Sequence, residues 1–224
     1  MKKVITLLCL VISYTTFSQT TENKKEKEKE KVAVLFYVGI GVQLQNSFSI
    51  NDKLKAANLP ELNEFTPEFS FGWNLFAEKF SGDVEFGFAS SKNDNAVAKN
   101  RFMGFNTRIR GHYNFVNKEK YAFTGGLTFA ASSNELDVFG KNTTVDLNNL
   151  GTLDGNLIGL KNQMFFVGPS VSLYLFKNKS SKIKLNLGYE FAFTNGKWKS
   201  DFATINNTVK EIGNNRVMFG ISLL

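Results

Sequence analysis

The sequence predicts an all-β fold, an eight-stranded antiparallel up-and-down transmembrane β-barrel with short periplasmic turns and long extracellular loops. Three observations predict it. Large apolar residues alternate with small or polar ones along eight segments, which is the period of a β-strand. The chain has 23 Phe and 18 Gly but only 3 Pro, a balance that favours strands. The connections between the segments alternate between long and short.

The N-terminus has the pattern of a secretory signal peptide. Two lysines precede an apolar run over residues 4–12, and Ser18 offers a small residue for cleavage. Cleavage there would also remove Cys9, the only cysteine, so the mature chain cannot form a disulfide. The following stretch is rich in Lys and Glu and has no apolar residue, which predicts disorder. The expected organisation is a signal peptide over 1–18, a disordered charged tail over 19–31 and an outer-membrane β-barrel over 32–224.

Composition excludes some classes of protein. Outside the N-terminus no apolar run is long enough for a membrane-spanning helix, whereas a barrel strand needs only about ten alternating residues. The net charge of +7 falls to +5 once the two lysines of the signal are removed. This modest excess gives no reason to expect nucleic acid as a partner of an exported protein.

The first three strands are expected at 34–45, 69–77 and 84–89. In the first, Val, Phe, Ile and Leu occupy one face, and Tyr, Gly and Gln occupy the other. The second and third alternate mostly aromatic residues with small or polar ones, and a tight turn over 79–82 joins them. Between the first and second strands, residues 49–60 predict a short helix inside a long loop. That helix would be capped by Ser49 or Asn51 and ended by Pro60.

The clearest alternation lies in the fourth segment, 103–115, which follows a polar loop over 90–100. Its apolar face carries Met103, Phe105, Ile109, Tyr113 and Phe115, and its polar face carries Arg108, Arg110 and His112. The remaining strands are expected at 121–130, 165–175, 183–194 and 216–223. Tight turns over 117–120 and 177–181 and long loops over 131–162 and 195–213 connect them.

The apolar face is predicted to contact lipid. It is bulky and aromatic at almost every position, which is more than the interior of an eight-stranded barrel can hold. The other face consists mostly of Gly, Ala, Ser, Thr, Asn and Gln, residues that fit inside a narrow barrel. A soluble lipocalin-like barrel would require the reverse arrangement. Hydrocarbon therefore remains as the partner of the apolar face.

Three stretches carry a resemblance to a known family. They are the N-terminus ending in Phe17-Ser18-Gln19, the opening Phe36-Tyr-Val-Gly-Ile-Gly-Val42 and the final Arg216-Val-Met-Phe-Gly-Ile-Ser-Leu-Leu224. Over residues 32–224 the chain resembles small outer-membrane β-barrels of the OmpA/OmpX kind, and more narrowly the outer membrane protein beta-barrel domain group that includes PorT-like proteins. The resemblance implies the outer membrane of a Gram-negative bacterium, with outer-membrane lipid and the barrel assembly machinery as partners.

Charged residues on the inner face are the main candidates for a site. They are Glu85, Arg108, Arg110, His112, Lys184, Glu190 and Arg216. The hairpin of the third and fourth strands would place Glu85 opposite Arg108 or Arg110, and Glu190 could meet Arg216. The pattern favours a salt-bridge network that fills the lumen, because an unpaired charge there would be costly. A charged constriction or gate for small ions is the alternative interpretation.

Catalysis is not expected. His112 is the only histidine, and it faces the lumen near the end away from the long loops, at the wrong depth for an outer-leaflet lipid. The sequence has no Gly-x-Ser-x-Gly elbow, no cluster of metal ligands and no phosphate-binding loop. We therefore expect no catalytic residue, no cofactor and no metal.

Apolar residues in the long loops are the second group of candidates. They are Phe139, Leu147, Leu157, Trp198 and Phe202. Either the strands extend beyond the membrane and the loops pack together, or these residues form a surface for a protein or glycan partner. The expected role is that of a non-enzymatic envelope scaffold or of a loop-mediated surface interaction. The alternatives are a narrow ion or solute channel, an accessory to protein secretion, or a soluble lipocalin-like binding barrel.

Overall fold

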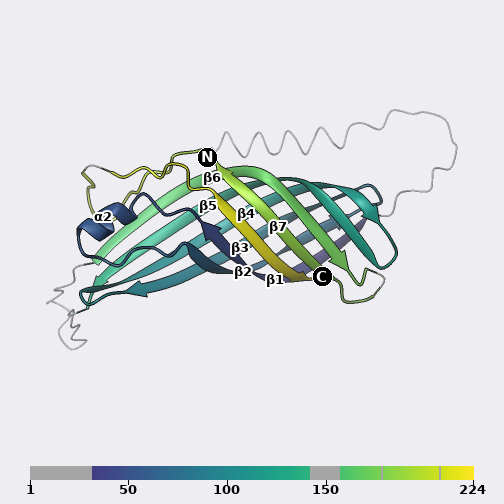
Figure 1. Cartoon of the computed structure of the whole chain (residues 1–224), viewed down its shortest axis with the longest axis horizontal. Coiled ribbons are helices and arrows are strands. Elements are labelled where there is room, and N and C mark those ends of the chain that lie inside the picture. The colour runs from purple at the N-terminus through teal and green to yellow at the C-terminus, as the bar shows by residue number, and fades with distance from the viewer. Residues whose placement is uncertain (1–31, 142–156, 178, 207) are drawn as a thin grey trace. The chain divides into compact units, whose positions relative to one another are not determined.

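Eight strands form one closed barrel in the computed structural model, which describes residues 32–141, 157–177, 179–206 and 208–224. Each strand pairs antiparallel with its neighbours in the sequence, and β8 closes the ring on β1 (Figure 1). The predicted class, an all-β eight-stranded antiparallel up-and-down barrel, is confirmed. The signal peptide and tail expected over 1–31 lie outside the described residues. In the described part of the chain, no helix has the length and apolar character needed to cross a membrane.

The two rims of the barrel carry different connections. The elements are β1 (Ala33–Gln45), α2 (Asn51–Ala56), β2 (Phe65–Phe76), β3 (Phe80–Asp94), β4 (Ala98–Asn117), β5 (Tyr121–Gly140), β6 (Leu157–Leu175), β7 (Ile183–Ala192) and β8 (Arg216–Leu223). The terminal rim carries the C-terminus and the turns after β2, β4 and β6. The loop rim carries the connections after β1, β3, β5 and β7.

Four strands continue well beyond their predicted ends. β3 reaches Asp94 and β4 begins at Ala98, so a short turn replaces the polar loop that the sequence predicts over 90–100. β5 and β6 also pair residue by residue up to Phe139 and Leu157, within the long loop predicted over 131–162. Both predictions are wrong because polar residues in this part of the strands face outward. They keep the strand conformation but remove the apolar signal by which a strand is recognised.

A short helix lies in the β1–β2 connection, as predicted, but neither predicted residue caps it. α2 begins after Ile50, and no side chain caps its first turn. Asn51 instead binds the backbone of Leu62: its Oδ1 accepts the N–H at 2.8 Å, and its Nδ2 donates to the carbonyl at 3.1 Å. The prediction failed because Asn51 satisfies a distant backbone pair rather than the helix terminus, which fixes the fold of the connection.

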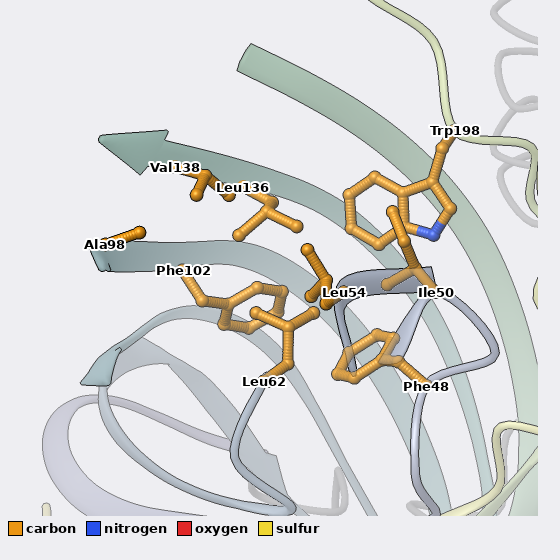
Figure 2. Close-up of a cluster of buried hydrophobic side chains, with 9 residues drawn as sticks. All are labelled: Phe48, Ile50, Leu54, Leu62, Ala98, Phe102, Leu136, Val138 and Trp198. Atoms are coloured by element: carbon orange, nitrogen blue, oxygen red, sulfur yellow. The ribbon is translucent and has the colours of Figure 1, made fainter. Parts of the chain in front are cut away.

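The connection that contains α2 packs on an apolar cluster at the loop rim, which we call the cap cluster (Figure 2). Its members are Phe48, Ile50, Leu54, Leu62, Ala98, Phe102, Leu136, Val138 and Trp198, none more than 5% exposed. The ring of Phe48 lies 5.4 Å from that of Phe102 and 6.3 Å from that of Trp198. Burial of such side chains contributes roughly 1.5–3 kcal/mol each. The cap cluster is therefore a small hydrophobic core that closes the loop rim.

Large apolar side chains cover the outer face of the barrel. We call this surface the apolar belt, and its members include Phe36, Phe69, Phe88, Ile109, Phe129, Phe165 and Phe219. On β6 the belt runs from Phe165 to Leu175, and the next outward residues, Gln163 and Lys161, are polar. About ten residue steps of roughly 3.3 Å, tilted by about 40°, give a height of about 25 Å, the height of an outer-membrane apolar band. A soluble lipocalin-like barrel requires the opposite orientation, so that alternative is contradicted.

Candidate functional site

The inner face of the barrel holds four carboxylates and four cationic side chains, which we call the lumen network. The carboxylates are Glu68, Asp83, Glu85 and Glu190, and the cations are Arg108, Arg110, Lys184 and Arg216. None of these residues is more than 6% exposed. Four negative and four positive groups cancel, so the lumen network carries no net charge when all of them are ionised.

Arg108 lies at the centre of the lumen network and is fully buried. Its Nη1 lies 2.6 Å from a Glu68 oxygen and 3.0 Å from a Glu85 oxygen, and its Nε lies 2.9 Å from Glu190. Its Nη2 donates to the second oxygen of Glu68 at 3.2 Å. An uncompensated buried charge would cost several kcal/mol, and here three carboxylates surround one guanidinium.

Arg110 and Lys184 form the part of the lumen network nearer the terminal rim. Arg110 lies 2.7 Å from both Asp83 and Glu85, and Lys184 lies 2.5 Å from the other oxygen of Asp83. The hydroxyl of Tyr37 donates to Glu85 at 3.0 Å. Because Tyr37 comes from β1, Lys184 from β7 and Arg110 from β4, these contacts join opposite walls of the barrel.

Arg216 and Glu190 form the part of the lumen network on β7 and β8. They are direct cross-strand partners, and the Nε of Arg216 lies 2.5 Å from a Glu190 oxygen. Arg216 also donates to Asn106 at 2.9 Å, and its guanidinium carbon lies 4.0 Å from the centre of the Phe166 ring. At this distance the ring and the guanidinium form a cation–π contact.

The structure brings six of the seven inward residues named from the sequence into the lumen network. Glu85 is the cross-strand partner of Arg108 and contacts Arg110 as well. Sequence reasoning missed Glu68 and Asp83. Each lies one residue before the predicted start of a strand, so neither was given an inner or outer face. The alternation of faces along a strand would have placed both residues on the inner face. Glu68 is next to the outward-facing Phe69, and Asp83 is two residues before Glu85.

His112 faces the lumen but forms no ion pair among the described residues, which corrects its inclusion in a charge network. Its Nδ1 lies 2.9 Å from the Thr124 hydroxyl and its Nε2 lies 2.7 Å from the Ser170 hydroxyl. Ser170 also accepts from Thr128 at 2.7 Å. A serine beside a histidine is one part of a nucleophilic site, but here the other ring nitrogen faces a hydroxyl, and both residues are buried. His112, Thr124, Thr128 and Ser170 therefore form a buried polar cluster whose side chains bind one another.

A second buried carboxylate, that of Glu211, lies at the loop rim beside the cap cluster. It is fully buried and accepts from the backbone N–H groups of Ser49 and Ile50 at 2.6 and 3.2 Å. It also accepts from the indole N–H of Trp198 at 2.5 Å and from Asn214 at 2.8 Å. These contacts attach the β1–β2 connection to the β7–β8 connection. This role could not be predicted from the sequence, because Glu211 lies in a segment without strand periodicity.

The five apolar residues predicted in loops have different positions. Trp198 is 2% exposed and belongs to the cap cluster, which fits the interpretation that the loops pack together and not the alternative of an interaction surface. Its indole is buried because it packs on Phe48 and binds Glu211. Phe202 is exposed in a connection, whereas Phe139 and Leu157 are paired strand residues rather than loop residues. Leu147 lies outside the described residues.

The chemistry available to these sites is limited. Among the described residues, no three His, Cys, Asp or Glu side chains are arranged to hold a metal ion. The charged groups of the lumen are paired with one another and shielded from solvent. The arrangement favours a packed interior that links the walls of the barrel over a polar pathway lined by free charges.

Comparison with known proteins gives similar folds but no family. No family model matches the chain, and no curated protein does either. Ail, the attachment invasion locus protein of Yersinia pestis, is 7% identical, with a TM-score of 0.47 over 88% of this chain and 100% of that one. Neisserial surface protein A is 10% identical, with a TM-score of 0.36 over 85% of this chain and 98% of that one. CarO of Acinetobacter baumannii is also 10% identical, with a TM-score of 0.34 over 83% and 96%.

These neighbours are small outer-membrane β-barrels with eight strands. The OmpA/OmpX-like architecture expected from the sequence is confirmed by the closed eight-stranded barrel of the chain itself. The narrower likeness to PorT-like proteins is not tested and stays a prediction.

Proposed function

We propose that the chain is an integral outer-membrane β-barrel without enzymatic activity, which acts as an envelope scaffold with its loop rim at the cell surface. The apolar belt supports the membrane part of this proposal. Side chains such as Phe36, Phe129 and Phe165 are about half exposed, and a contiguous surface of this kind needs a hydrocarbon partner. Because the number of strands is even, the first strand begins and the last strand ends at the same rim. This rim would be the periplasmic one.

The single observation that carries the scaffold role is the lumen network. A channel needs free charges or a water-filled path along its axis, whereas here Arg108 is fully buried among three carboxylates. The cap cluster adds an apolar layer at the loop rim. Both features favour a sealed barrel over the narrow ion or solute channel that the sequence left open.

Two measurements test this proposal. Fractionation of the native cell should recover the protein with the outer membrane, and the extracted protein should change its migration on a gel when it is heated. In planar bilayers the purified barrel should show no steady conductance. Ion-selective openings that disappear in Arg108→Ala would contradict the scaffold role, and recovery in the periplasm without detergent would contradict the membrane assignment.

The loop rim is the proposed place for any interaction with a protein or glycan. Phe202 is 83% exposed there, and Phe139 and Val97 are also exposed at the same rim. Exposed aromatic residues beside polar ones are typical of binding surfaces. A pull-down with the intact barrel should lose its partner in Phe202→Ser and keep it in Phe80→Ser, because Phe80 is also an exposed phenylalanine, at 62%, but lies at the terminal rim. Equal loss in both variants would contradict a site at the loop rim.

A further inference from the structure

Four exposed lysines share the outer face of the barrel just above the apolar belt, and we call this surface the lysine face. Lys161 on β6 forms an antiparallel bridge with Lys199, and Lys197 forms another with Lys210. The Lys161 and Lys199 backbones exchange hydrogen bonds of 2.7 and 2.8 Å. Because Trp198 points inward to the cap cluster, its neighbours on either side point outward. The β7–β8 connection thus adds a basic extension to the edge of β6.

Like charges opposite one another destabilise a sheet, so these pairs require a reason. Lys161 has partial compensation, since its ammonium lies 2.5 Å from Asp201 and its cross-strand neighbour on β5 is Glu135. Within the described residues, no ion pair reaches the other three lysines. The lysine face therefore holds three cations without a protein partner. An anion from outside the chain would relieve their repulsion.

A depression of about 490 Å³ lies between these lysines and the edge of β6. Lys161, Lys197 and Lys199 line it, together with Gln163, Thr194 and Asn162. Asn162 is 1% exposed, and among the described residues neither its amide nitrogen nor its amide oxygen has a hydrogen-bond partner. Such a group is rare in a folded protein and indicates a missing partner. Both amide atoms lie on the inner face of β6, opposite to Lys161 and Gln163, so the depression itself is lined by the lysines and by outward polar residues.

Gly196 allows the added segment to approach this asparagine. A Cβ on Gly196 would lie 2.6 Å from the amide nitrogen of Asn162 and 2.6 Å from the carbonyl oxygen of Gln163. Any other residue would therefore push the segment away from β6. The close approach places Lys197 and Lys199 at the edge of the depression.

The depth of the lysine face indicates which anion it meets. Phe165 and Phe193, the last apolar residues below it, have ring centres 6.3 Å apart and are both about half exposed. Gln163 and Lys161 follow directly above Phe165 on the same face of β6. The lysines thus lie just outside the hydrocarbon, at the level of lipid headgroups. Basic residues at this level attract anionic lipids.

We propose that the lysine face binds the phosphate groups of phosphorylated lipid in the outer leaflet, with the acyl chains against Phe165 and Phe193. This inference rests on the proposed outer-membrane function. The lysines contact phosphate oxygens as point charges. A lipid is favoured over soluble phosphate because apolar and basic surfaces adjoin in one site.

The test measures the affinity of the full-length folded barrel for lipid in detergent, by native mass spectrometry. The unaltered barrel, a variant and a control are each measured with diphosphoryl lipid A and with phosphatidylcholine. The variant is Lys197→Gln with Lys199→Gln and Lys210→Gln. The matched control is Lys79→Gln with Lys118→Gln and Lys120→Gln, which removes three exposed lysines from the terminal rim. We expect the variant to lose roughly 10- to 100-fold in affinity for lipid A, and the control to change less than about twofold. Replacement of the same three loop-rim lysines by Arg should retain binding.

Equal affinity of the Gln variant and the unaltered barrel overturns the proposal, as does displacement of lipid A by inorganic phosphate at matched concentration. Heat-modifiable migration of every variant shows that the barrel is folded. A chain that never inserts into membranes contradicts the proposed function, whereas an inserted barrel with lysine-independent lipid binding contradicts the lysine face alone.

Discussion

Arg108 and Glu68 form a two-point ion pair inside the barrel, with nitrogen–oxygen distances of 2.6 and 3.2 Å. The two residues come from β4 and β2, which are not neighbours in the sheet. The same guanidinium reaches Glu190 on β7, on another wall. One side chain thereby links three strands that share no backbone hydrogen bonds with one another. Since the apolar side chains face outward, the lumen network is the core of this part of the barrel.

Replacing Arg108 with Met should strongly destabilise the barrel. The substitution keeps much of the side-chain volume but leaves Glu68, Glu85 and Glu190 without their shared cation in a buried site. Breaking a buried pair in this way costs about 3–5 kcal/mol. The free energy of unfolding, measured with urea in detergent micelles by the loss of heat-modifiable migration, should fall by that amount.

Arg101→Met is the matched control for that prediction. Arg101 lies on the same strand and pairs with Asp137 at 2.6 Å, but its side chain is 44% exposed. Exposed pairs contribute only about 0–1 kcal/mol. Equal losses for the two substitutions would show that the lumen network does not stabilise the barrel more than a surface pair does.

The sequence was sufficient to predict the number of strands and the orientation of their faces. Each strand has a two-residue period within the apolar belt, and this period assigns Arg108 and Glu190 to the interior. The period became unreadable above the apolar belt, where both faces can be polar. For this reason the upper parts of β5 and β6 were predicted as loop, and Phe139 with them.

The contacts across the lumen could not be predicted in the same way. The sequence allows the register between two consecutive strands to be predicted. This register pairs Glu85 with Arg108 and Glu190 with Arg216. The contact from Arg108 to Glu68 depends on which walls of the closed ring face each other, and that depends on the stagger of the strands. The role of Glu211 was equally hidden, because its partners lie in two connections without periodicity.

Gly87→Ala should destabilise the barrel although the added group is only a methyl. A Cβ on Gly87 would lie 2.6 Å from the carboxyl carbon of Glu68, which would displace this carboxylate from Arg108. Overpacking of a filled interior typically costs about 1–3 kcal/mol. Gly111→Ala is the control, because a Cβ there meets no atom within 4 Å. Urea unfolding of the two variants should differ in midpoint, and identical midpoints would contradict the tight fit of Glu68.

Glu211→Gln should loosen the loop rim without unfolding the barrel. An amide presents only one acceptor oxygen, whereas the carboxylate accepts from two backbone N–H groups, an indole and an amide. Leaving buried donors unpaired costs about 1–3 kcal/mol, so local opening should become roughly 5- to 150-fold more frequent. Trypsin should then cut faster after Lys53 or Lys55 in α2. The control is Glu64→Gln, an exposed carboxyl in the same connection, which should leave the cleavage rate unchanged.

The position of the apolar belt can be tested on a single strand. Leu127 and Phe139 both face outward on β5, at 54% and 40% exposure, but only Leu127 lies within the belt. Leu127→Lys places a charge in hydrocarbon and should cost about 2–4 kcal/mol, whereas Phe139→Lys, beyond the belt, should cost about 0–1 kcal/mol. Urea unfolding from phosphatidylcholine vesicles would measure both. If the two substitutions cost the same in vesicles, β5 does not cross the bilayer at the level of Leu127, and the proposed membrane position of the barrel is wrong.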